Sequence, residues 1–422
     1  MSKQNLVNRS QSCLSRVLGH ATELEIEKGE GSYLIDYDGS RYLDFGAGIA
    51  VNATGHCHPR VVKAIKDQSE RLLHGCAGVI YYDQNITFAE EIGAITGNEL
   101  HSVFFTQSGT EAVEAALKCA TYVRNKQQII AFKGSFHGRT LGSLSVTTSN
   151  EKYLDRYPLA YSDRIILEYP YYLNNESPLN TEEGYLNYLH KSLKAIDGSN
   201  VAAVIIEPVL GEGGYVPAPT SVLQTIRDWC DETGVLLIFD EIQSGIGRTG
   251  HWFCFQHHGV VPDILTSAKG IASGLPLGAC ISTTAIMDQW TTGSHGGTYG
   301  GNPLSCVAGS ATLAVLKPLL STVKTQGDMA LNHLKNELAN HPNVADIRGL
   351  GLMIGIEFSH PDGPAAAAKL VSQIRSICLD NKLLLVSCGK NGHVIRLMPP
   401  LTISDDELAN GLSIFVNACQ HL

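Results

Sequence analysis

Short apolar runs alternate with longer stretches of helical spacing through the middle of the chain. The runs are rich in β-branched and aromatic residues and are continuously apolar, which predicts strands that are covered on both faces. Helices are predicted between them, for example over 110–125, 219–233 and 303–317. This order predicts an α/β fold with a mostly parallel sheet flanked by helices. The predicted strands are 102–106, 128–133, 164–168, 201–208, 235–241, 263–269 and 277–283.

The pattern differs at the two ends of the chain. Residues 31–45 alternate apolar and polar positions around Asp38-Gly39, which predicts a hairpin that follows a polar arm. After residue 325, helical and strand patterns mix, which predicts a small α+β domain. The hairpin is expected to join this domain because chain termini often lie close together. We therefore expect an N-terminal arm and hairpin over 1–58, a large domain over 59–324 and a small domain over 325–422. Within the small domain the predicted elements are helices over 325–340, 364–381 and 404–420, and strands within 344–358, 383–387 and 394–400.

Composition narrows the class of protein. The 422 residues carry 31 Lys and Arg against 41 Asp and Glu, a net charge of −10, which counts against nucleic acid or an anionic membrane as partner. A hydrophobic share of 44% is typical of globular proteins. No apolar run reaches the ~18 residues of a membrane span, and the N-terminus does not resemble a secretory signal. The 11 scattered cysteines indicate a reducing, cytoplasmic location.

Two loops that follow predicted strands carry residues suited to binding an anion and a planar ring. Ser108, Gly109 and Thr110 open a helix, where free backbone N–H groups and the helix dipole favour an anion. The loop 134–140 combines Phe136, His137 and Arg139, which could stack on a ring and bind a carboxylate. Each pattern alone has an ordinary alternative, a helix cap in the first case and a solvated loop in the second.

Two further strands end in charged residues. Asp240 closes the run 235–241, where a buried acid is costly unless it meets a cation. Lys269 closes the run 263–269, and a desolvated lysine is a nucleophile that forms Schiff bases, although a lysine at the surface is the alternative. An anion site, a ring stacker, a carboxylate and a lysine in this order are what pyridoxal phosphate requires. His56-Cys57-His58 could suggest a metal site, but no further ligand cluster accompanies it, so we expect none.

The chain resembles the class III (ω-) aminotransferases of the fold-type-I pyridoxal phosphate enzymes, in the branch of the 4-aminobutyrate, acetylornithine and ornithine enzymes. The resemblance extends from about Gly29 to the C-terminal helix. The motifs that carry it are GAGIAVNATGHCHP (46–59), SGTEAVEAALK (108–118), FHGRT (136–140), EPVLGEGG (207–214), FDEIQSGIGRTG (239–250), SAKGIASGLPLGA (267–279) and GGTYGGNPLS (296–305).

The resemblance implies a role for each matching position. Lys269 would form the Schiff base with pyridoxal phosphate, and Asp240 would pair with its pyridine nitrogen. Arg139 would bind the substrate carboxylate, while Glu207 and Arg396 would form a switch pair. The family also implies a homodimer, or a dimer of dimers, with shared active sites. The other expected contacts are with cofactor at Ser108, Gly109, Thr110, Phe136, His137 and Gln243, with the neighbouring subunit's phosphate at Thr298, and with substrate at Ile49.

The expected reaction is transamination of an ω-amino acid with 2-oxoglutarate, most simply of 4-aminobutyrate to give succinate semialdehyde and glutamate. N-acetylornithine or ornithine is the alternative donor, because FHGRT resembles the acetylornithine enzymes while GIAVNATGH resembles the 4-aminobutyrate enzymes. A racemase, decarboxylase or aminomutase with the same cofactor, and a phosphate-binding protein without covalent catalysis, are further alternatives.

Overall fold

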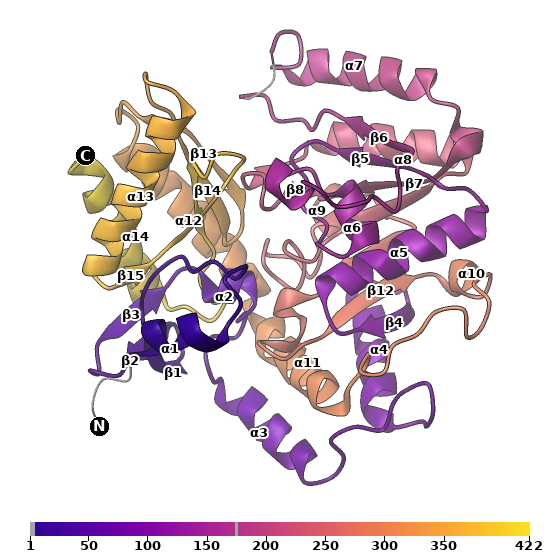
Figure 1. The fold of residues 1–422 in the computed structure, drawn as a ribbon, viewed down its shortest axis with the longest axis horizontal. Helices are drawn as coiled ribbons and strands as arrows, with labels where there is room; N and C mark the ends of the chain where they lie inside the picture. Colours follow the sequence, from indigo (N-terminus) through magenta and orange to yellow (C-terminus); the bar gives the residue numbers. More distant parts are fainter. Residues whose placement is uncertain (1–4, 174–175) are drawn as a thin grey trace.

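A computed structural model describes residues 5–173 and 176–422 of the chain (Figure 1). Its largest sheet has seven strands in the order β4-β12-β11-β10-β7-β5-β6. Only β12 runs antiparallel to its neighbours, so the α/β fold with a mostly parallel sheet is confirmed. The strands are β4 (Ser102–Thr106), β5 (Gln128–Phe132), β6 (Arg164–Leu167), β7 (Val201–Ile206), β10 (Leu236–Asp240), β11 (Ile264–Ser267) and β12 (Gly278–Ser282).

Helices bury both faces of this sheet, which explains why its strands are continuously apolar. Alternate residues of each strand enter two separate cores: Ile205 and Ile238 pack with α5 (Gly109–Arg124), whereas Ile206 and Phe239 enter the larger core. That larger core includes side chains from α7 (Glu182–Ala195) and α8 (Thr220–Thr233). All six residues of β7 are buried as a result.

A second sheet forms the C-terminal part of the molecule, in the order β13-β14-β17-β16. Its core contains residues of α12 (Leu320–Glu337), α13 (Pro364–Asp380) and α14 (Asp405–Gln420). The helix predicted from residue 325 begins five residues earlier, at Leu320. The strand predicted over 394–400 ends at Leu397, shortly before Pro399 and Pro400, which lack the backbone N–H groups that strand pairing needs. The strands are β13 (Val344–Leu350), β14 (Met353–Phe358), β16 (Val386–Cys388) and β17 (Val394–Leu397).

The N-terminal hairpin pairs with a strand from the C-terminal part of the chain. β2 (Tyr33–Asp36) and β3 (Arg41–Asp44) are antiparallel, and β3 is parallel to β15 (Leu383–Leu384). Figure 1 shows β2 and β3 below α14 and β15, which come from the other end of the chain. The strand predicted over 383–387 is split between two sheets, because β15 pairs with β3 while β16 pairs with β17. The boundaries of the three predicted domains remain a prediction.

Shorter elements complete the described chain. The remaining helices and strands are α1 (Leu6–Cys13), β1 (Ile26–Glu30), α2 (Ala47–Ala50), α3 (Pro59–Ser69), α4 (Asp83–Ile95), α6 (Leu141–Val146), η1 (Glu151–Tyr153), η2 (Gly198–Asn200), β8 (Val209–Leu210), β9 (Val216–Pro217), α9 (Phe255–His258), η3 (Lys269–Ala272), α10 (Thr284–Met287), α11 (Pro303–Leu316) and η4 (Lys317–Leu319).

The helical stretch Pro303–Glu337 is long and apolar enough to cross a membrane by length and composition alone. Its first helix, α11, instead packs against α3 and α4 within the large core, where Cys306 and Leu316 are fully buried. A Cβ atom added at Gly309 would lie 2.4 Å from the ring of Phe88 on α4, so the two helices are in close contact. This packing accounts for the apolar composition of α11.

Helix α14 packs closely against Phe45, which directly follows β3, so the two ends of the chain are in contact. A Cβ atom at Gly411 would lie 2.2 Å from Cζ of Phe45, whose side chain is fully buried. We expect Gly411→Ala to destabilise the protein by roughly 1–3 kcal/mol, as overpacking does, although alanine normally favours a helix. Gly19→Ala is the control, because nothing lies within 4 Å of that position. Urea unfolding of both variants measures the change, and an unaltered Gly411→Ala midpoint would contradict it.

Candidate active site

A cavity of about 550 Å³ lies at one edge of the seven-stranded sheet. Its walls come from the residues that follow β4, β5, β7, β10 and β11, which all run in the same direction. Carboxyl ends of such strands meet at one edge, where α/β proteins place their ligands. The cavity brings together most of the predicted site residues: Ile49, Ser108, Gly109, Thr110, Phe136, His137, Arg139, Glu207, Asp240, Gln243 and Lys269. Arg396 and Thr298 do not line it.

Lys269 lines the cavity from the first position of η3, directly after β11. Its backbone has a φ of +47°, in the left-handed region that residues other than glycine seldom adopt, and such strained positions concentrate at functional sites. Burial of the ammonium, together with the positive charge of Arg396, lowers the pKa of Lys269 to about 8. Roughly a tenth of this amine is therefore neutral, and nucleophilic, at pH 7, far more than for an ordinary lysine.

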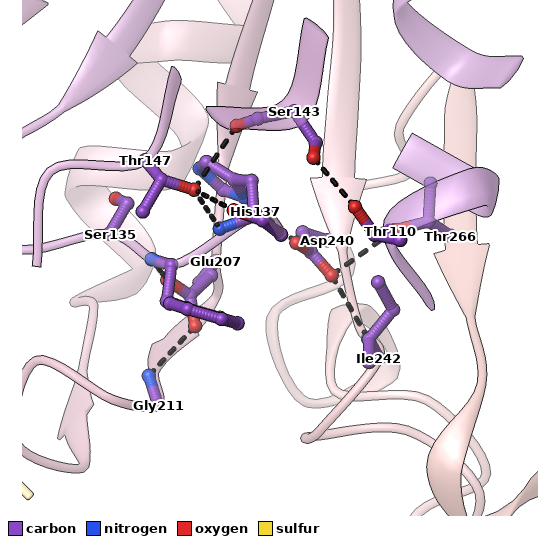
Figure 2. Close-up of polar contacts among 12 residues, drawn as sticks. Thr110, Ser135, His137, Ser143, Thr147, Glu207, Gly211, Asp240, Ile242 and Thr266 are labelled. Atoms are coloured by element: carbon purple, nitrogen blue, oxygen red, sulfur yellow. Dashed lines mark hydrogen bonds and ion pairs between the residues drawn. The ribbon is translucent and has the colours of Figure 1, made fainter. Parts of the chain in front are cut away.

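Asp240, at the end of β10, is held in place by hydrogen bonds to both carboxylate oxygens (Figure 2). Oδ2 lies 2.8 Å from Nδ1 of His137, while Oδ1 accepts from the backbone N–H of Ile242 and from Oγ1 of Thr266. Within the described chain, neither a lysine nor an arginine pairs with this buried carboxylate. Asp240 is therefore available to a cationic group of a ligand, and His137 orients it from the buried side.

The amino-terminal end of α5 forms another wall of the cavity. Ser108 is the N-cap, and its Oγ accepts from the backbone N–H of Glu111. The first N–H groups of a helix have no partner within the helix, so Gly109 and Thr110 offer donors for an anion. Thr110 Oγ1 lies 2.7 Å from Oγ of Ser143, and a Cβ at Gly138 would lie 2.2 Å from Thr110 Oγ1. Glycine is needed at Gly138, where φ is +130°.

Glu207 is a structural anchor for two loops of the site. Its side chain is 5% exposed, and its two oxygens accept from the backbone N–H groups of Phe136 and Gly211, each at 2.8 Å. Burial raises the pKa of Glu207 to about 7. These bonds hold the loop that carries Phe136 against the loop that begins at Gly211. Figure 2 shows the bond between Glu207 and Gly211.

The prediction that Arg396 pairs with Glu207 is wrong, because the carboxylate that pairs with Arg396 is that of Glu212. Arg396, buried on β17, pairs through Nη1 with Oε2 of Glu212 at 3.1 Å and donates through Nη2 to the carbonyl of Ser387. Glu207 forms no ion pair with Arg396 in the described chain, and each of its oxygens instead accepts a backbone N–H. Glu212 lies in EPVLGEGG between two glycines, so it projects from a turn into the cavity. Those flanking glycines were the signal in the sequence that could have identified it.

Other predicted residues occupy distinct places around the cavity. Ile49 is 48% exposed and lines the cavity from an irregular turn, with a φ of +65°. Gln243 lines it as well, and its Oε1 accepts from the hydroxyl of the buried Tyr215, which sequence reasoning missed. Thr298 is exposed outside the cavity. His56 binds the carboxylate of Asp44, and no group of metal-ligating side chains occurs in the described ranges.

Comparisons with known proteins agree with this geometry. The chain matches the model of the family "Aminotransferase class-III" over residues 16–419. It is 38% identical to an acetylornithine aminotransferase of Clostridium acetobutylicum over 96% of this chain and 98% of the relative. It is 37% identical to a 5-aminovalerate aminotransferase of Pseudomonas aeruginosa over the full length of both chains, covering 100% of each. A 4-aminobutyrate aminotransferase of Escherichia coli is 36% identical and is covered to 97%, with 98% of this chain matched.

A solved structure shares the fold. The ornithine aminotransferase of Toxoplasma gondii, with PLP (pyridoxal phosphate) at partial occupancy in its active site, superposes with a TM-score of 0.87 and 28% sequence identity. The match covers 100% of this chain and 95% of that one.

The lowered pKa of Lys269 predicts how its amine reacts with an aldehyde. The rate at which pyridoxal phosphate becomes reducible onto the apoprotein by borohydride should rise with pH and be half-maximal near pH 8. An ordinary lysine would give a midpoint near about 10.4, because only the neutral amine is nucleophilic. Peptide mapping of the reduced protein identifies the modified residue, and Lys269→Ala should take up no label at this position. Label on another lysine, or a midpoint near 10, would contradict the assignment.

Proposed function

Because the chain belongs to the class-III aminotransferase family, we propose that it transfers the amino group of an ω-amino acid to 2-oxoglutarate, with 4-aminobutyrate as the donor. The ion pair between Arg396 and Glu212 beside the cavity of Lys269 is the main support for this proposal. In this pair Glu212 can neutralise Arg396 while the bound substrate has no carboxylate for that arginine.

The enzyme depends on pyridoxal phosphate, which supplies an electron sink for the electrons left when a C–H bond beside the substrate nitrogen is broken. The residues fit this group. Asp240 has a buried carboxylate that no lysine or arginine of the described chain pairs with, and it would hold the pyridine nitrogen protonated. Phe136 would face the ring, and Gln243 would contact its hydroxyl. Ser108, Gly109 and Thr110 at the start of α5 would bind the phosphate.

Lys269 has two roles in the proposal. Its neutral amine would hold the cofactor, and once substrate has displaced it the same amine would accept and return a proton at the substrate carbon. Its place at the end of β11, with a pKa lowered to about 8 by burial and by Arg396, suits both roles near neutral pH.

One pocket must accept two unlike substrates in turn. An ω-amino acid carries its carboxylate far from the reacting nitrogen, whereas glutamate also carries one beside the reacting carbon. Arg139 at the cavity wall would bind the distant carboxylate of both. Arg396 is needed only for the α-carboxylate of glutamate or 2-oxoglutarate, and an unpaired buried charge is costly in the other half-reaction. Glu212 would neutralise it there and move aside when glutamate binds.

N-acetylornithine is the second candidate donor. It also presents a carboxylate far from the reacting nitrogen, and the relative at 38% identity is named for it. The name of the relative at 37% identity adds 5-aminovalerate, one carbon longer than 4-aminobutyrate. All of these donors satisfy Arg139 in the same way, so chain length and the acetyl group are what the pocket must distinguish.

We further propose a cytoplasmic homodimer in which Thr298 reaches the phosphate in the second copy's site. Thr298 is exposed, and neighbouring Tyr299 is 60% exposed. Val79 and Tyr81 are 77% and 95% exposed, and such large apolar side chains are typical of a covered interface. All 11 cysteines are free thiols in the described chain, which suits a reducing compartment. Sedimentation of a monomer that fully retains the cofactor would contradict this assembly.

The corrected switch pair predicts different effects on the two half-reactions. Glu212→Gln should slow the half-reaction of the ω-amino donor about tenfold or more, or 1.4 kcal/mol, because Arg396 then lacks its counter-charge. The half-reaction with the substrate glutamate should be nearly unchanged, since the α-carboxylate of that substrate takes the place of the Glu212 side chain beside Arg396.

Single-turnover absorbance changes of the bound cofactor measure each half-reaction separately. Glu207→Gln is the matched control. It should impair both half-reactions alike, because Glu207 supports the loops of Phe136 and Gly211 rather than Arg396. Equal losses in both half-reactions for Glu212→Gln would remove the switch from the proposal.

A comparison of donors tests the proposed substrate. We expect 4-aminobutyrate to give the highest kcat/KM with 2-oxoglutarate, above 5-aminovalerate, N-acetylornithine, ornithine and β-alanine. Glutamate formation is the common readout for all five donors. A preference of tenfold or more for N-acetylornithine, about 1.4 kcal/mol in transition-state binding, would replace 4-aminobutyrate by the second candidate.

A further inference from the structure

The two arginines proposed to bind substrate carboxylates are held in different ways. Arg396 is buried and carries a carboxylate partner, Glu212. Arg139 is exposed at the cavity wall, and within the part of the chain that the structure describes no carboxylate pairs with it. An arginine with many rotamers needs some other contact to keep its guanidinium in one place.

Two aromatic rings provide that contact. The guanidinium carbon of Arg139 lies 4.6 Å from the ring centroid of Tyr153 and 5.4 Å from that of Phe136. Both distances are within the range of cation–π attraction. The rings of Tyr153 and Phe136 meet nearly edge to face, at 5.7 Å and 73°. Tyr153 is half-buried at the end of η1, outside every motif that the sequence analysis singled out.

We propose that Tyr153 is a positioning residue for substrate recognition, whose ring holds the guanidinium of Arg139 ready for the carboxylate that is distant from the reacting nitrogen. This inference rests on the proposed role of Arg139. A ring face attracts the cation without using its N–H groups, so the donors at the edge of the guanidinium remain free for a bidentate carboxylate. A protein carboxylate in the same place would compete with the substrate.

The difference between the two arginines then matches what each must do. Both substrates bring a distant carboxylate, so Arg139 is always used and needs orientation but no counter-charge. Only one substrate brings an α-carboxylate, so Arg396 needs a counter-charge that can leave, which is Glu212. Holding Arg139 by a ring lowers the entropy that substrate binding would otherwise lose in ordering it.

A ring series at position 153 tests this role in the holoenzyme. Calorimetry would measure the dissociation constants of valerate, a monocarboxylate that cannot react, and of 1-aminobutane, an amine without a carboxylate. Tyr153→Leu should weaken valerate about two- to fivefold, the loss that an exposed cation–π contact corresponds to. Tyr153→Phe should bind valerate like the wild type, and Tyr153→Trp at least as tightly, because indole is the strongest of the three rings. Binding of 1-aminobutane should change less than twofold throughout.

Kinetics and a control in the same turn complete the design. In Tyr153→Leu the KM for 4-aminobutyrate and for 2-oxoglutarate should rise by the same two- to fivefold factor while kcat is kept. Glu151→Gln should leave all of these quantities unchanged, since its ion pair with Lys390 is exposed and, among the residues that the structure describes, Glu151 forms no ion pair with Arg139.

The outcomes separate this inference from the proposed function. If Arg139→Gln binds valerate as tightly as the wild type, Arg139 does not recognise carboxylates, and both the proposed substrate site and the role of Tyr153 are wrong. If Arg139→Gln weakens valerate but Tyr153→Leu does not, only the role of Tyr153 is wrong. Equal losses in Tyr153→Phe and Tyr153→Leu would assign the effect to the hydroxyl group and overturn the cation–π argument.

Discussion

The common direction of β4, β5, β7, β10 and β11 is the constraint on which the active site depends. It brings the ends of five strands to one edge, so that five short loops supply nearly all of the cavity wall. Asp240 pairs in register with Thr266 of the neighbouring strand, and Lys269 follows three residues later. The register between the strands therefore brings Asp240 and Lys269 to the same end of the sheet, where both line the cavity.

Two glutamates that line the cavity differ in what surrounds them, and this difference decides what each can do. Glu207 receives two backbone N–H groups and is held still, with burial raising its pKa to about 7. Glu212 instead faces one side-chain partner, the guanidinium of Arg396, across 3.1 Å. A carboxylate bound by the backbone supports a loop, whereas one bound by a side chain can exchange that partner for a substrate.

The second sheet contributes to the site from the other side of the cavity. Arg396 extends from β17, and Arg348 of β13 donates through Nη2 to the carbonyl of Gly214, two residues beyond Glu212. Arg348 is itself fixed by Glu357 and by the hydroxyl of Tyr171, so the turn of Glu212 is held by a buried ionic cluster. The geometry of the ion pair between Arg396 and Glu212 thus depends on how the two sheets pack, and neither sheet contains the pair alone.

The sequence by itself predicted the seven strands of the large sheet and the helices between them, because these features depend on local patterns of apolar residues. The order of the strands in the sheet came only from the structure. It also identified Asp240, Lys269 and the start of α5 as candidates for one site, since each follows directly from a strand or opens a helix, and the structure brings them to one cavity. Only the tertiary structure decided between Glu207 and Glu212, five residues apart in a glycine-rich turn, because partner choice depends on which backbone donors lie nearby. The contact of Tyr153 with Arg139 likewise could not be predicted from the sequence. Tyr153 lies in a turn after α6 and Arg139 in a loop before it, and no sequence periodicity relates the two segments.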